Sequence, residues 1–89
     1  MSSDIDSMWP ELDMIFARVS ELDEADVKAA VAKELDGCSD GYLDDLYKLT
    51  HDWGATFVGR GKSELEKRKR RILTSHIWQR GKDIPRSRK

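Results

Sequence analysis

The residues with the clearest chemical potential lie in the last third of the chain, where five cations follow one another. They are Lys67, Arg68, Lys69, Arg70 and Arg71. At about 100° per residue in a helix, one side of this segment is apolar and carries Leu65, Ile72, Leu73, His76 and Ile77. The other side carries Lys67, Arg70, Arg71, Thr74 and Trp78. Cations neutralise phosphates and an exposed aromatic ring can stack on a base. This face therefore predicts binding of DNA or RNA, with an acidic protein surface as the open alternative.

Further cations flank the same segment on both sides. The residues predicted to contact nucleic acid or a protein partner are Arg60, Lys62, Lys67, Arg70, Arg71, Trp78, Arg80 and Lys82. Lys69 falls within the apolar side, where its stem can snorkel or its ammonium can pair with an acid of an earlier helix. The alternative without a ligand is a solvated charged face, with Trp78 packed in the core or in a dimer.

A second motif, Gly61-Lys62-Ser63, has the ending of a phosphate-binding loop. The full pattern G-x4-G-K-[ST] would need glycine at position 56, where this chain has Thr56, and no hydrophobic strand precedes it. Ser63 and Glu66 instead have the spacing of a capping box at a helix start. We interpret the motif as a helix cap, with no bound nucleotide.

Other catalytic or metal-binding patterns are incomplete. The segment 36–47 follows a calcium loop in part, but Cys38 stands at its third position and Tyr47 at its twelfth, where a bidentate glutamate is required. His51, His76 and Cys38 are widely separated and show no zinc-site spacing. We therefore expect no metal, no cofactor, no catalytic residue and no enzymatic activity.

Charge divides the chain into two halves. Residues 1–53 hold 14 acids and 4 bases, and residues 54–89 hold 3 acids and 12 bases, so a net charge of −1 conceals a strong asymmetry. The acidic half makes a helix-turn-helix reader in residues 23–53 unfavourable, because its second helix would repel phosphates. The acids of residues 1–53 either solvate ordinary helix faces or imitate DNA phosphates. The acids that could imitate phosphates are Asp13, Glu21, Asp40, Asp44, Asp45 and Asp52.

Apolar spacing predicts an all-α fold, a small bundle of three to four antiparallel helices with short loops and a basic C-terminal helix. The first helix starts after Ser7 and buries Leu12, Ile15, Phe16, Val19 and Leu22. The second runs from Asp23 to Gly37 with Val27, Ala30, Val31 and Leu35 inside, and the third runs from Ser39 or Asp40 to Gly54 with Leu43, Leu46, Tyr47, Thr50 and Trp53 on one face. Residues 54–61 contain three glycines and predict a loop, with 55–58 briefly extended. A fourth helix starts at Ser63 and ends at Gln79 or Arg80, with Gly81 as its stop.

These elements give a disordered N-terminus at 1–6, one helical domain at 7–80 and a flexible basic tail at 81–89. The single cysteine, Cys38, the absence of an apolar run long enough to span a membrane, and a polar, acidic start predict a cytoplasmic protein.

From these features we predict a small non-enzymatic regulatory protein that binds a polyanion, DNA or RNA, through its last helix, with homodimer formation also considered. The alternative is a protein-binding inhibitor or antiactivator, of phage or mobile-element type, that blocks a functional surface of its partner.

Overall fold

The computed structural model describes residues 8–84 and is helical, with no strand among those residues. The helices are α2 (Trp9–Val19), α3 (Glu24–Asp36), α4 (Asp40–Gly59) and α5 (Glu64–Asp83). The prediction of an all-α fold is therefore confirmed. The predicted disorder of residues 1–6, the capping role of Ser7 and the end of the predicted tail, residues 85–89, lie outside the described part of the chain.

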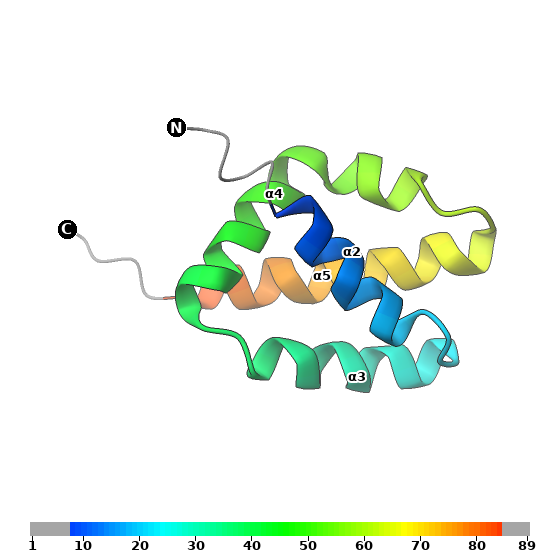
Figure 1. The fold of residues 1–89 in the computed structure, drawn as a ribbon, viewed down its shortest axis with the longest axis horizontal. Coiled ribbons are helices and arrows are strands. Elements are labelled where there is room, and N and C mark those ends of the chain that lie inside the picture. Colours follow the sequence, from blue (N-terminus) through cyan, green and yellow to red (C-terminus); the bar gives the residue numbers. More distant parts are fainter. Residues whose placement is uncertain (1–7, 85–89) are drawn as a thin grey trace.

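Helix α5 occupies the middle of the bundle. Figure 1 shows α4 and α3 along its two sides, while α2 crosses it on the near side. Arg68 pairs with Glu24 near the start of α3, and Arg80 pairs with Asp36 at the end of α3. These two pairs show that α3 and α5 run in the same direction, so the predicted antiparallel arrangement is not confirmed for this pair.

The core collects apolar side chains from every described helix, largely at the predicted spacing. The residues that are almost completely buried are Leu12, Ile15, Val19, Val27, Val31, Leu35, Leu46, Leu49, Phe57, Leu73 and Ile77. Three residues predicted for apolar faces lie largely outside the core, because Leu22 is 37% exposed, Leu65 is 45% exposed and Trp53 is 46% exposed. Leu22 also lies beyond the end of α2 at Val19. Burial at helical spacing supplies most of the driving force for such a bundle.

Two serine caps fix the starts of the longer helices as predicted. The Ser39 hydroxyl accepts a hydrogen bond from the Tyr42 backbone N–H at 3.2 Å, and the Ser63 hydroxyl accepts one from the Glu66 N–H at 3.1 Å. Each bond satisfies a backbone donor that the helix itself leaves unpaired. Gly37 ends α3, also as predicted.

The predicted loop at 54–61 is wrong for most of its length, because α4 continues through Gly54 to Gly59. Phe57 lies within this extension and is fully buried, with its ring edge-on to Phe16 at 5.8 Å. Burying a phenylalanine is worth about 1.5–3 kcal/mol, which offsets the cost of the helical glycines Gly54 and Gly59, roughly 1 kcal/mol each. Figure 1 shows α4 changing direction along its length. The Thr50 hydroxyl donates to the Leu46 carbonyl at 3.0 Å, a contact that often bends helices.

Tyr42 ties α4 to α2 and makes the bundle sensitive to alkaline pH. Its hydroxyl donates to the Glu11 carboxylate at 2.9 Å. Burial, followed by this hydrogen bond, raises the pKa of Tyr42 from 10.0 to about 12. The stabilisation is thus fully present below pH 10 and is lost as the pH rises through about 12. We expect an ultraviolet titration to show a late phenolate step that Tyr42→Phe removes. Completion of that step near pH 10 would contradict the contact.

Candidate functional site

The cations of α5 divide into two sets according to the direction in which they point. Arg68, Lys69, Arg70 and Arg80 have partners elsewhere in the bundle, whereas the side chains of Lys67, Arg71 and Lys82 make no hydrogen bond or ion pair with any other residue between 8 and 84. The sequence had placed Arg70, Arg80 and the second set in one predicted binding surface. The structure brings only the second set together on one face.

Lys69 caps the end of helix α2. It is only 8% exposed, and its ammonium donates to the Ser20 carbonyl at 2.8 Å. Ser20 is the C-cap of α2, where unpaired carbonyls and the helix dipole favour a cation. The predicted acid partner is therefore replaced by a backbone carbonyl, and Lys69 serves the packing of α2 on α5.

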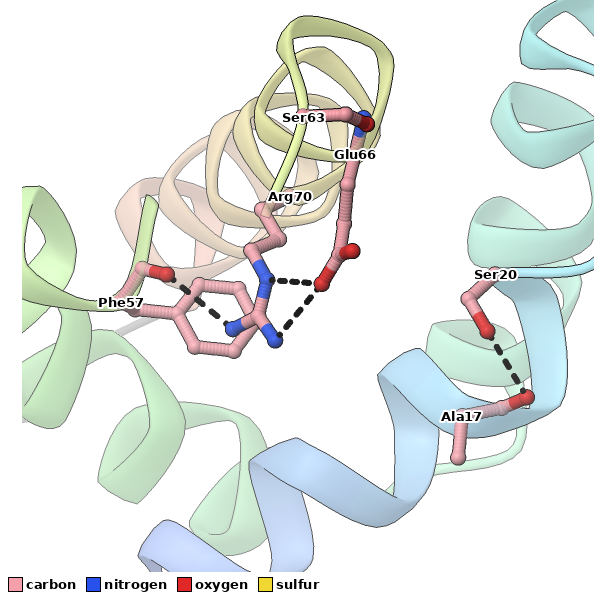
Figure 2. Close-up of polar contacts among 6 residues, drawn as sticks. All are labelled: Ala17, Ser20, Phe57, Ser63, Glu66 and Arg70. Atoms are coloured by element: carbon pink, nitrogen blue, oxygen red, sulfur yellow. Dashed lines mark hydrogen bonds and ion pairs between the residues drawn. The ribbon is translucent and has the colours of Figure 1, made fainter. Parts of the chain in front are cut away.

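Arg70, which the sequence predicted as a partner-binding residue, is largely buried within the bundle. Its side chain is 13% exposed, and its guanidinium lies 4.6 Å from the ring centres of both Phe16 and Phe57. Figure 2 shows it donating to the Phe57 carbonyl at 3.1 Å and to one Glu66 carboxylate oxygen at 3.2–3.3 Å. Glu66 therefore holds Arg70, where the capping-box prediction had it reaching back towards Ser63.

Two further predicted contact residues already have partners within the chain. Arg80 pairs with the Asp36 carboxylate and donates to the Ala32 carbonyl at 3.3 Å, so it covers the end of α3. Arg60 lies over the Trp9 ring at 4.6 Å and remains exposed. We therefore assign Arg80 to the packing of α3 on α5.

The remaining predicted residues form a continuous outer row along α5. Lys67, Arg71, Trp78 and Lys82 are spaced by 4, 7 and 4 positions, which places them on one helix face. At 1.5 Å per residue the row is about 22 Å long. Arg71, Trp78 and Lys82 are exposed in this row and Lys67 is half-buried, while Lys62 stands exposed in the turn before α5. We call Lys67, Arg71, Trp78 and Lys82 the outer row.

Gly61 sets the position of Lys67 at the start of the outer row. A Cβ atom on Gly61 would lie 2.7 Å from Lys67 Cγ and 2.9 Å from its backbone nitrogen. Only a residue without a side chain fits there without displacing α5. The glycine of the Gly61-Lys62-Ser63 motif thus serves close packing, and the serine serves the cap.

A groove runs beside the outer row between α5 and the second half of α4. It has a volume of about 450 Å³ and is lined by Gly54, Ala55, Val58, Gly59, Arg71, Thr74, Ser75 and Trp78. Trp78 is 43% exposed, with its ring stacked on His51 at 6.0 Å and edge-on to Tyr47 at 6.4 Å. Trp78 was predicted from the sequence as a contact residue, but the groove was not. The other wall of the groove belongs to residues 54–59, which were predicted to form a loop.

A second groove lies on the other side of Arg71, between α5 and the start of α3. Its volume is about 340 Å³, and its lining consists of Glu24, Lys28, Arg68, Arg71, Ile72, Ser75 and His76. Lys28 is a cation that sequence reasoning missed, since it stands in the acidic half of the chain and only the packing of α3 on α5 brings it here. Arg68 is held by Glu24 at 3.3 Å, so Lys28 and Arg71 are the unpaired cations of this groove within the described residues.

Residues 8–84 contain no group of three or more His, Cys, Asp or Glu side chains that could hold a metal ion. None of the helices described combines the length and apolar character needed to cross a membrane. No protein-family model, curated protein or solved structure matches the chain.

Proposed function

We propose that this protein is a non-enzymatic regulator that binds nucleic acid in the cytoplasm, through the exposed face of its basic C-terminal helix. The observation that carries the proposal is the outer row. Lys67, Arg71 and Lys82 have no acidic partner within the described residues, although the chain is rich in acids, and Trp78 is exposed among them. Unpaired cations beside an aromatic ring are the combination that phosphates and bases require.

The pairing of the other cations supports this choice. Arg18, Arg68 and Arg80 all meet carboxylates of α3, at Glu34, Glu24 and Asp36. The chain thus uses its acids to neutralise cations between helices, and it leaves the outer row free. A polyanion that follows α5 would find about three charges in line, with Lys28 and Lys62 close enough in the fold to add contacts.

Salt dependence is the direct test of this proposal. With about three phosphates neutralised, the slope of log K against log salt should be roughly −2 for a single strand and −3 for a duplex. Affinity for a labelled oligonucleotide should then fall roughly 20- to 40-fold between 50 and 200 mM salt. Fluorescence anisotropy with single-stranded and duplex DNA and RNA measures this fall. Absence of binding to all of them at low salt would refute the proposal.

Single-charge variants locate the binding face. Arg71→Gln should weaken binding and reduce the magnitude of the salt slope by about one unit, because one phosphate contact is lost. Arg18→Gln removes the same charge from α2, at a residue outside the outer row that pairs with Glu34, and should leave the slope unchanged. Equal effects of the two variants would show that binding follows net charge and not the outer row.

The alternative, a protein-binding inhibitor or antiactivator, would use the same unpaired cations of the outer row against an acidic surface. It is the conclusion to adopt if no nucleic acid binds at low salt and Arg71→Glu abolishes the capture of one specific protein partner.

A further inference from the structure

We infer that the groove between α4 and α5 receives an unstacked base, so that the preferred ligand is a single-stranded nucleic acid and not a duplex. This inference rests on the proposed function and specifies its ligand. It is carried by three features: the shape of the groove, the placement of its charge, and the position of α5 between two other helices.

The groove has the form that a flat ring needs. One wall is the Trp78 ring, which packs against the rings of His51 and Tyr47 at 6.0 and 6.4 Å between ring centres. The opposite wall contains Gly54, Ala55, Val58 and Gly59, so that small side chains leave the space open. Aromatic stacking accepts any base, because every base presents a π face, and so a slot of this kind predicts little sequence preference.

Charge lies where the backbone of such a strand would run. Arg71 lines the groove itself, and Lys67 lies one turn before it on the same face of α5. Neither cation has an intramolecular partner among residues 8–84. A base beside Trp78 would therefore leave its neighbouring phosphates within reach of Arg71 and Lys67, and Lys82 lies one turn beyond Trp78 for the next part of the strand.

The position of α5 disfavours a duplex. A recognition helix enters a major groove about 12 Å wide, which admits one helix of about 10–12 Å diameter. Helix α5 is packed against both α4 and α3, which lie along its two sides (Figure 1). Three helices side by side are too wide for that groove, whereas a flexible single strand can follow a furrow between helices.

The test compares three probes of equal length at low salt: an oligo(dT) strand, the same strand with abasic sites, and a duplex. Anisotropy titrations should show the oligo(dT) strand bound more tightly than the duplex. It should also bind roughly 5- to 150-fold more tightly than the abasic strand, the range expected for stacking of one base. Trp78→Ala should remove this preference and leave abasic-strand binding unchanged. Trp53→Ala removes a similarly exposed tryptophan outside the groove. It should change neither the preference for oligo(dT) nor the binding of the abasic strand.

A second variant guards against loss of folding in Trp78→Ala. Gly59 lines the groove, and a Cβ atom there meets nothing within 4 Å, so Gly59→Leu can begin a side chain at the groove wall without a clash at its Cβ. It should reduce the preference for oligo(dT) over the abasic strand while circular dichroism stays unchanged. Equal binding of these two strands, or tighter binding of the duplex, would overturn the inference and leave the polyanion proposal standing. No binding of any probe would overturn both.

Discussion

Replacing Arg70 with alanine should lower the free energy of unfolding by about 2–4 kcal/mol. This is a much larger change than we expect for alanine at the adjacent Arg71. The guanidinium lies between the rings of Phe16 and Phe57, donates to the Phe57 carbonyl and meets the Glu66 carboxylate. The truncation would remove all these contacts and open a space between α2, α4 and α5. The Phe57 carbonyl would then keep only the Arg60 backbone N–H as its donor.

The neighbouring Arg71→Ala variant is the matched control for this prediction. Arg71 is exposed and has no partner within residues 8–84, so its loss should change stability by less than about 0.5 kcal/mol. Urea unfolding followed by tryptophan fluorescence measures both variants. Arg70→Lys, which keeps the charge but not the planar fork, should fall between them. Equal stability of the alanine variants would show that Arg70 is a surface residue.

Nucleic-acid binding should rank the same two arginines in the reverse order. Arg71→Ala should weaken binding in a fully folded protein. Arg70→Ala should reduce binding only by the fraction of molecules that unfold, because its guanidinium is already occupied within the chain. Together the two measurements separate the structural cation from the functional one.

Local sequence signals predicted the elements of this fold well. The apolar spacing of Leu12, Ile15, Phe16 and Val19 marks the buried face of α2, and the Ser39 and Ser63 caps mark the starts of α4 and α5. These signals depend on residues within four positions of one another, so they can be detected without knowledge of the tertiary structure.

Long-range packing decided the features that the sequence could not predict. Three glycines favoured a loop at 54–61, but Phe57 packs on Phe16 and keeps α4 helical to Gly59. The same extension supplies the carbonyl that holds Arg70 and one wall of the groove beside Trp78. One wrong assignment of a loop thus concealed both the internal role of Arg70 and the groove. The direction of a side chain at the edge of a helix face depends on which neighbour covers that face.

Gly81 is the other residue whose role the structure changes, and a bulkier side chain there should have a large effect. The sequence suggested a helix stop, but α5 continues to Asp83 and Gly81 is buried against Tyr47. A Cβ atom at position 81 would lie 2.5–2.6 Å from three carbon atoms of Tyr47, including its Cβ. Overpacking of this kind should make Gly81→Val destabilising by roughly 2–4 kcal/mol in thermal or urea unfolding. Gly41→Ala, where a Cβ meets nothing within 4 Å, should be neutral or slightly stabilising.

A double-mutant cycle distinguishes the packing role of Gly81 from a helix-stop role. With Tyr47 present, Gly81→Ala gains about 1 kcal/mol of helix propensity but meets the Tyr47 side chain, so a net loss of stability is expected. In a Tyr47→Ala background the clash is gone, and the same change should become stabilising. A stop residue would instead give the same loss in both backgrounds, because the strain would lie in its own backbone. Since Tyr47 also supports the Trp78 ring, Gly81→Val should weaken the preference for oligo(dT) over an abasic strand even where the protein remains folded.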